Sequence, residues 1–221
     1  SLSQALMREL QSELDRIAAD AGARVVIVAG AGKAFCAGHD LKEMRSNPAK
    51  AFQRALFGQC SKLMLTLVRM PQPVIARVHG IATAAGCQLV SMCDLAVASD
   101  NARFAVSGVN LGLFCSTPSV GLSRNLGRKQ ALEMLLTGEF IDAQTALARG
   151  LVNRVVASEQ LDAEIRKLSD SILAKTPVAI KAGKQAFYRQ LEMGLDEAYE
   201  LASEVMACNM MAEDAQEGID A

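Results

Sequence analysis

The chain has 221 residues, of which 51% are hydrophobic, and its formal net charge is −1. This size and composition predict one folded domain with a sizeable core and argue against disorder. A near-neutral charge without a basic run argues against nucleic acid as a partner. Because no apolar stretch reaches membrane-spanning length and no signal peptide is visible, we expect no membrane span.

Hydrophobic periodicity predicts alternating helices and strands, followed by helices only, as is typical of an α/β core with a parallel sheet. Ser3 is the expected cap of the opening amphipathic helix. The continuous apolar strand at 25–29 is of the type that is buried on both faces. The predicted helices lie at 3–17, 52–67, 84–93, 119–126, 129–136, 143–148, 158–174, 177–190 and 195–211, and the predicted strands at 25–29, 74–78, 95–99, 103–106 and 151–156.

Residues 107–118, the cysteines and the histidines support three further expectations. Residues 107–118, SGVNLGLFCSTP, show no period and are predicted to be irregular. The six cysteines form no C-x-x-C pair and lie mostly in apolar contexts, so we expect reduced, buried thiols of an intracellular protein. Only two histidines are present, which argues against a His-rich metal site, and no metal is expected.

Two small-residue loops, each following a strand, are the candidate functional elements. One is KAFCAGHD at 33–40, and the other is ATAAGC at 82–87. The first amides of a helix have no intrahelical acceptor, and side chains as small as those of Ala84, Ala85 and Gly86 would let a ligand oxygen approach them. Two such loops could aim two N–H groups at one oxygen. Close helix–strand packing, which also requires small residues, is the alternative explanation.

The segment FCAGHDLKEM, followed later by PVIARVHGIATAAGCQLVSMCDLAVAS, resembles the crotonase, or enoyl-CoA hydratase/isomerase, superfamily. The resemblance covers nearly the whole chain, and ATAAGCQL with GVNLGLFCSTP is similar to the enoyl-CoA hydratase domain-containing subgroup. It implies a crotonase-like spiral of ββα turns at 1–157 and a C-terminal helical trimerisation region at 158–221. A homotrimer or hexamer is therefore expected. The family's first strand pair would precede Ser1 and further tail would follow Ala221, so we expect a chain trimmed at both ends.

The resemblance also implies that the protein binds acyl-CoA thioesters, with CoA as part of the substrate and no separate cofactor. Its shared device is an oxyanion hole of two backbone N–H groups, which motif matching assigns here to His39 and Ala85. The side chain of His39 is expected to be solvent-facing or structurally bonded. Ala37, Asp40 and Leu41 are expected near the nucleotide end of the CoA site, although Asp40 could equally be a helix cap.

Two departures from the family pattern concern its catalytic glutamates. Gln88 stands at the first glutamate position and Gly108 at the second. Glutamine can position water but has no usable proton affinity, and glycine has no side chain. Hydration should therefore be crippled, and restoring both glutamates should recover it unless Gly108 needs a positive φ.

Residues in the stretch at 107–118 could replace the lost groups. Asn110, Cys115, Ser116 and Thr117 are expected beside the acyl group, with Asn110 and Thr117 as substrate contacts. Cys115 is the only ordinary nucleophile or acid among them, and an apolar setting would raise its pKa. Hydrogen bonding and packing within the loop is the alternative role for each of the four.

We therefore expect an acyl-CoA thioester-processing protein of fatty acid metabolism, in the lyase or isomerase class. It would stabilise a thioester enolate and have noncanonical or weak hydratase activity. A CoA-thioester-binding protein without turnover is the main alternative, and an assembly subunit acting through its helical tail is a third. The expected location is the cytoplasm if the source is bacterial and the mitochondrial matrix if it is eukaryotic.

Overall fold

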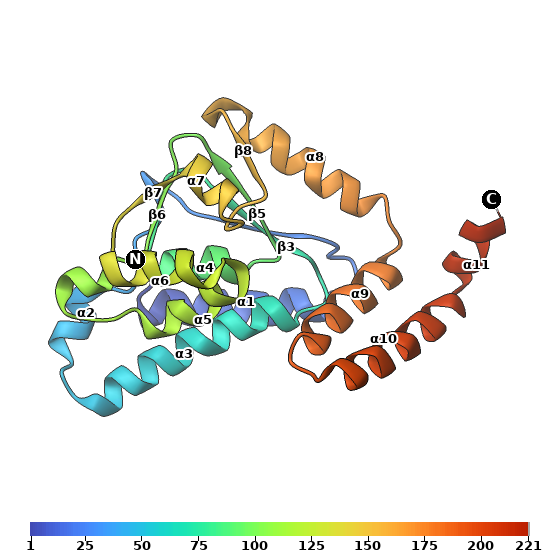
Figure 1. Ribbon diagram of the computed structural model, residues 1–221, viewed down its shortest axis with the longest axis horizontal. Coiled ribbons are helices and arrows are strands. Elements are labelled where there is room, and N and C mark those ends of the chain that lie inside the picture. Colours follow the sequence, from blue (N-terminus) through green and yellow to red (C-terminus); the bar gives the residue numbers. More distant parts are fainter. Residues whose placement is uncertain (221) are drawn as a thin grey trace.

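The computed structural model describes residues 1–220 and contains two four-stranded sheets surrounded by helices (Figure 1). Successive strand pairs each add one strand to each sheet, and helices connect the pairs. This is the expected spiral of ββα turns, and the α/β crotonase-like fold is confirmed. The first sheet, all parallel, is β1 (Val26–Ala29), β3 (Val74–Val78), β5 (Leu95–Ser99) and β8 (Arg154–Val156) in spatial order. The second is β2 (Ala34–Cys36), β4 (Ile81–Thr83), β6 (Arg103–Ala105) and β7 (Ile141–Asp142), with β7 antiparallel to β6.

The helices occur in the predicted order, and the last three lie to one side of the rest of the molecule (Figure 1). Over residues 1–220, no helix combines the length and the apolar character needed to cross a membrane. The α-helices are α1 (Gln4–Ala19), α2 (Leu41–Ser46), α3 (Lys50–Arg69), α4 (Ala85–Met92), α5 (Ser116–Asn125), α6 (Arg128–Thr137), α7 (Ala143–Ala148), α8 (Leu161–Leu173), α9 (Pro177–Gln190), α10 (Leu195–Met210) and α11 (Glu213–Asp220), and two short 3₁₀ helices are η1 (Ser107–Leu111) and η2 (Ser158–Gln160).

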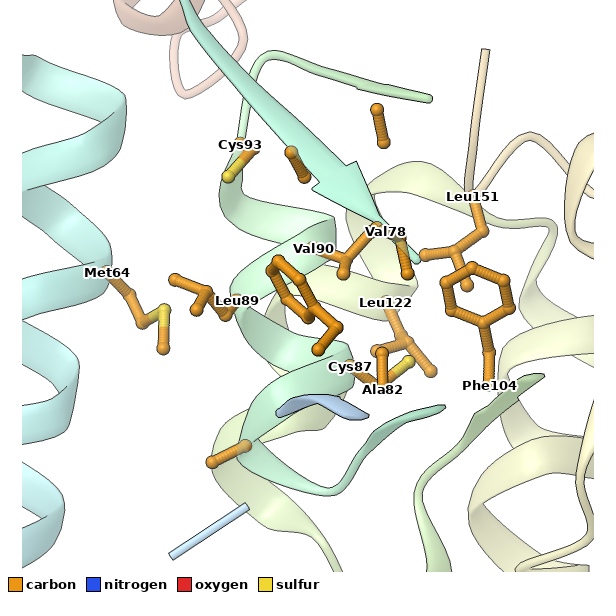
Figure 2. Close-up of a cluster of buried hydrophobic side chains, with 14 of the residues drawn as sticks. Met64, Val78, Ala82, Cys87, Leu89, Val90, Cys93, Phe104, Leu122 and Leu151 are labelled. Carbon is orange, nitrogen blue, oxygen red and sulfur yellow. The ribbon is translucent and has the colours of Figure 1, made fainter. Parts of the chain in front are cut away.

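Helix α4 lies at the centre of the core. Every residue from Ala85 to Ser91 is buried, as expected for a helix that is apolar or small on all sides. Figure 2 shows Leu89 and Val90 of α4 among Met64 of α3, Val78 of β3 and Phe104 of β6. The N-terminus of α4 is thus fixed from several directions, which gives its first amides a rigid orientation.

Strand β1 corrects one prediction. The apolar run at 25–29 was expected to be buried on both faces, which is wrong, since Ile27 is 39% exposed. Among residues 1–220, β1 pairs with β3 alone and forms an edge of its sheet. An edge strand has fewer neighbours to cover its second face, although its composition is the same as that of a central strand.

The short elements around the two glycine-rich loops were not predicted. β2 and β4 have three residues each, inside KAFCAG and GIATAAG, where the small residues obscure any period. The stretch at 107–118 is also more regular than expected. It forms the 3₁₀ helix η1, and α5 begins at Ser116 instead of residue 119.

Helix α8 and the helices after it attach differently to the core. α8 packs Leu161, Ile165 and Leu168 against Ile75 and Val97 of the first sheet. Among residues 1–220, α9, α10 and α11 contain no fully buried residue. The boundary between a core at 1–157 and a helical region at 158–221 stays a prediction.

A buried ion pair anchors α9 to the core. The carboxylate of Asp94, just after α4, accepts hydrogen bonds from Lys184 Nζ at 2.6 Å and from Tyr188 Oη at 2.8 Å. It also accepts from the Val74 N–H at 2.6 Å, at the start of β3. The Lys184 side chain is 6% exposed and that of Asp94 is 14% exposed. Burial lowers the pKa of Lys184, while the Asp94 carboxylate opposes that shift.

Candidate active site

The two small-residue loops meet at the ends of β2 and β4. Gly38 has φ +88, and a Cβ built on it would lie 3.0 Å from Ala84 Cβ and 3.5 Å from the Ala85 nitrogen. The backbone around Gly38 and His39 therefore contacts the turn that opens α4. The two small-residue loops are therefore in backbone contact, while the prediction that they aim two N–H groups at one oxygen stays a prediction.

The His39 and Ala85 amides have no recorded backbone acceptor. Among the loop, turn and cap hydrogen bonds of residues 1–220, neither N–H donates, whereas the Ala84 N–H donates to the Ala105 carbonyl oxygen at 3.0 Å. Ala85 is the first residue of α4, a position whose N–H lacks an intrahelical acceptor. Neither donor has an acceptor among these hydrogen bonds, while Ala85 is only 1% exposed, so the access of a ligand oxygen to both donors and their convergence on it stay predictions.

Ala84 has a strained backbone. Its φ of 51° and ψ of −120° make it the only non-glycine residue with positive φ among residues 1–220. Such conformations typically cost about 1–3 kcal/mol and concentrate at functional sites. Here the strain accompanies the sharp turn from β4 into α4, which places the Ala85 N–H beside Gly38.

Replacing Ala84 with glycine is expected to stabilise the protein by about 0.5–2 kcal/mol, because glycine adopts this conformation freely while gaining some entropy in the unfolded chain. Urea unfolding measures the change. Ala31→Gly is the control, since Ala31 is exposed, lies outside the helices and strands and does not have a positive φ, so only the unfolded-state effect remains and a small loss is expected. A lower stability of Ala84→Gly than of the parent would contradict the strain at Ala84.

Both histidine side chains are held by backbone carbonyl oxygens. His39 Nδ1 lies 3.3 Å from the Leu2 carbonyl oxygen, and the ring packs edge-on against Phe57 with centroids 5.6 Å apart. Burial lowers the pKa of His39, with the Leu2 hydrogen bond opposing the shift, so the imidazole is neutral at pH 7. His79 Nε2 lies 2.9 Å from the Gly32 carbonyl oxygen. These contacts are structural.

Asp40 caps α2, which was one of the two roles considered for it. Its Oδ1 accepts hydrogen bonds from the N–H groups of Lys42 at 2.9 Å and Glu43 at 3.2 Å. These bonds lower the pKa of Asp40, chiefly that from Glu43. Ala37 and Leu41, the other residues expected near the nucleotide end of CoA, are exposed on either side of His39.

Gln88 points toward α3. Gln88 is only 4% exposed, and its side-chain Oε1 lies 4.0 Å from the Cys60 Sγ. Burial raises the pKa of the Cys60 thiol to about 12, so this neighbour is neutral. The amide is therefore packed among buried groups.

Gly108 lies in η1, and the chain that follows folds over it. A Cβ at this position would lie 2.4 Å from the Leu113 carbonyl oxygen and 2.7 Å from the Cys115 Sγ. Gly108 is not among the glycines with positive φ, so the backbone condition set for restoring the second glutamate does not apply. Close approach of the 113–115 segment is the reason that a larger residue does not fit.

The other residues of the stretch at 107–118 make mainly local contacts. Asn110 is exposed, with Nδ2 3.5 Å from the Gly138 carbonyl oxygen, and Thr117 is half-buried in the first turn of α5. Ser116 Oγ donates to the Phe114 carbonyl oxygen at 3.4 Å. Burial raises the pKa of Cys115, with the Gly108 backbone opposing the shift. Cys115 is therefore a protonated thiol at neutral pH and a weak nucleophile.

All six cysteines are free, and the expectation that they are buried fails for two of them, half-buried Cys36 and exposed Cys208. Cys208 is exposed on α10, where its Sγ lies 3.3 Å from the Glu204 Oε1. Glu43, a charged residue in the first turn of α2, has a specific partner. Its Oε2 accepts a hydrogen bond from the Gln4 N–H at 3.0 Å, so it pairs one of the free N–H groups at the N-terminus of α1.

Within residues 1–220, His, Cys, Asp and Glu form no group of three or more that could hold a metal ion.

Residues 1–221 match the family model described as enoyl-CoA hydratase/isomerase. The chain belongs to this family. Among curated relatives, enoyl-CoA hydratase domain-containing protein 3 of Xenopus laevis, named mitochondrial, is 47% identical over 219 residues, which are 99% of this chain and 74% of the relative. A short-chain-enoyl-CoA hydratase of Clostridium acetobutylicum is 34% identical, covering 100% of this chain and 85% of the relative.

Solved structures of enoyl-CoA hydratase/isomerase family members have the same fold. An enoyl-CoA hydratase from Mycobacterium smegmatis superposes with a TM-score of 0.99 at 56% identity, covering 100% of this chain and 86% of the other. Human enoyl-CoA hydratase domain-containing protein 3 superposes with a TM-score of 0.96 at 46% identity, covering 100% and 87%. The resemblance to the domain-containing subgroup is thus confirmed.

One polar contact beside the enoyl-CoA hydratase/isomerase loops was not predicted. Thr83 Oγ1 and Ser107 Oγ are 3.0 Å apart, and both residues are half-buried. Each residue directly precedes a position already considered, Ala84 in one case and Gly108 in the other. The pairing of β4 with β6 brings the two hydroxyls together. In the sequence, the only signal of this contact was that Thr83 and Ser107 are next to Ala84 and Gly108.

Proposed function

We propose that this family member binds acyl-CoA thioesters, places the thioester oxygen on the His39 and Ala85 N–H groups, and stabilises the enolate formed there. The contact between Gly38 and the Ala84–Ala85 turn, together with two N–H donors that have no acceptor within the described loops and caps, is the observation that carries the proposal. Donors aimed at a developing oxyanion are worth about 3–4 kcal/mol each. CoA is part of the substrate in this proposal, and no separate cofactor is required.

The proposal assigns the surrounding residues to the two ends of the substrate. Ala37 and Leu41, exposed beside His39, would contact the nucleotide end of CoA, with Asp40 holding α2 in place. Asn110 and Thr117 would lie along the acyl group. Because the N–H donors belong to the backbone, the site depends on loop geometry more than on side-chain chemistry.

Hydration is proposed to be weak in this member. Water addition needs a group that accepts a proton and one that donates a proton, each typically worth about 10²–10⁴-fold in rate. Gln88 is a buried amide beside a neutral thiol, and Gly108 has no side chain. Enolate formation without water addition avoids the activation of water but still needs a base for the α-proton, and neither Gln88 nor Gly108 supplies one.

Crotonyl-CoA tests the proposal. We expect binding by isothermal titration calorimetry, with loss of the enoyl absorbance far slower than in a Clostridium-type short-chain hydratase assayed in parallel. A panel of acyl-CoA thioesters with mass detection then identifies the reaction. Absence of binding to every acyl-CoA would refute the proposal, and rapid hydration of crotonyl-CoA would refute the assigned weakness.

A CoA-thioester-binding protein without turnover is the second candidate. The packing of Leu113 and Cys115 over Gly108 favours it, because that segment fills the space in which a catalytic side chain would begin. Binding of the whole acyl-CoA panel without a mass change in any of its members would select this candidate over the first.

Restoring the two family carboxylates by Gln88→Glu with Gly108→Glu is now expected to fail. The new Cβ at 108 must displace the Leu113 carbonyl and the Cys115 thiol, and such overpacking costs about 1–3 kcal/mol. Urea unfolding and crotonyl-CoA hydration measure the two effects. Gly58→Glu is the matched control, since a Cβ at exposed Gly58 meets nothing within 4 Å. A stable double variant that hydrates rapidly would show that the 113–115 segment moves aside.

We expect a homotrimer or hexamer, because α9 and α10 expose large apolar side chains that a neighbouring subunit would cover. Multi-angle light scattering of the full-length protein checks this expectation, and a monodisperse monomer would contradict it. The exposed side chains include Phe187, Leu191, Leu195, Tyr199 and Met206. The proposed location is the mitochondrial matrix if the source is eukaryotic, in line with the relatives named mitochondrial, and the cytoplasm if it is bacterial.

A further inference from the structure

The Thr83–Ser107 hydroxyl pair has unused hydrogen-bonding capacity. Two hydroxyls carry two protons and four lone pairs, and the bond between Oγ1 and Oγ at 3.0 Å uses one of each. Within residues 1–220, neither oxygen makes a second hydrogen bond to the protein. One O–H donor and several lone pairs therefore stay unpaired within the protein, at a half-buried position.

The pair lies next to the proposed oxyanion hole. Thr83 is two residues before Ala85, so their Cα atoms are no more than about 7 Å apart. The strained turn at Ala84 fixes the direction between them. Ser107 directly precedes Gly108, and the Ala84 N–H bond to the Ala105 carbonyl oxygen ties the two segments together.

The hydroxyl groups of Thr83 and Ser107 limit which ligand groups the pair can bind. Neither hydroxyl ionises near neutral pH, so the pair cannot remove a proton from water as a carboxylate does. It can donate one hydrogen bond and accept others, which suits a ligand hydroxyl that does both. A saturated hydrocarbon chain in the same place would leave the open donor without a partner, which is costly.

We infer that Thr83 and Ser107 form a polar subsite that selects acyl-CoA thioesters with a hydroxyl on the acyl carbons adjacent to the thioester. C3 is two bonds beyond the carbonyl carbon and so is within reach of a group beside the Ala85 amide. The inference rests on the proposed function, because the thioester oxygen must accept hydrogen bonds from the His39 and Ala85 N–H groups. Thr83 and Ser107 are thus specificity-determining residues that bind a substrate oxygen.

The test compares two ligands that differ by one oxygen, 3-hydroxybutyryl-CoA and butyryl-CoA, by isothermal titration calorimetry. The parent protein should bind the hydroxylated thioester about 5- to 10-fold more tightly, as one net hydrogen bond predicts. In Thr83→Val with Ser107→Ala, the loss should fall on 3-hydroxybutyryl-CoA, and the ratio of the two affinities should approach one. Thr83→Ser keeps the hydroxyl and should keep the ratio.

The outcomes separate this inference from the proposed function. Binding of neither thioester by the parent refutes the proposed function and the subsite with it. Equal binding of both thioesters by the parent refutes the subsite alone, as does an unchanged ratio in the Val/Ala variant. Thermal unfolding verifies that the variants are folded, and Ser107→Ala alone, expected to lower the ratio, replaces the double variant if that one does not fold.

Discussion

Replacing Gly38 with alanine is expected to weaken acyl-CoA binding by about 10- to 100-fold, the equivalent of one or more charge-assisted hydrogen bonds. The new Cβ would lie 3.0 Å from Ala84 Cβ, 3.3 Å from the Thr83 carbonyl oxygen and 3.5 Å from the Ala85 nitrogen. The loop that carries the His39 N–H must therefore move away from the α4 turn. Isothermal titration with butyryl-CoA measures the loss.

Gly32→Ala separates the effect on the site from the effect on the backbone. Gly32 has φ +81, close to the +88 of Gly38, but a Cβ there meets nothing within 4 Å. Both variants should lose about 1–2 kcal/mol of stability through left-handed backbone strain. Only Gly38→Ala should lose affinity, and an equal loss in both variants would show that the loop contact is not needed for binding.

Replacing Lys184 with methionine is expected to lower the free energy of unfolding by about 3–5 kcal/mol, because it leaves a buried carboxylate without its cation. Lys184 Nζ also donates to the carbonyl oxygens of Leu67 and Gln72, each at 2.8 Å. The substitution leaves these acceptors unpaired as well. Urea unfolding followed by circular dichroism measures the change.

Two companion variants test the buried pair. Lys181→Met, one turn earlier on α9 and exposed, should change stability by less than about 0.5 kcal/mol. Asp94→Asn combined with Lys184→Met should be more stable than the sum of the single changes predicts, by about 0.5–3 kcal/mol. A Lys184→Met variant as stable as Lys181→Met would mean that α9 is held by other contacts.

The longer elements and the general layout could be predicted from sequence because their periods are long and clear. Helices such as α1 and α3 have apolar faces that repeat over several turns, and Ser3 accepts the Leu6 N–H at 3.2 Å, as expected of a cap. β2 and β4 are too short for a period of two to stand out from their small residues. Whether a strand is central or at an edge, as for β1, depends on neighbours far away in the sequence.

The candidate site was predicted where backbone geometry follows from small residues, and missed where distant segments meet. Gly38 and Ala85 could be linked because each lies in a small-residue loop that belongs to a family motif. The packing of Cys115 on Gly108 and the bond between Thr83 and Ser107 could not, since each joins side chains whose directions the chain alone does not specify. Glu43 and Asp94 likewise take roles that only their spatial partners reveal.

The parallel order of the first sheet also determines how the chain can acquire its structure. Val26 pairs with Val74, and Val97 pairs with Arg154, so each contact closes a long loop before any ladder forms. Loop closure of this kind raises contact order, and folding rates fall as contact order rises. During synthesis, β1 leaves the ribosome long before its partner exists, with Ile27 and its neighbours uncovered. Expression at lower temperature or with chaperones should therefore raise the yield of native protein, because slow strand pairing leaves apolar edges open to aggregation.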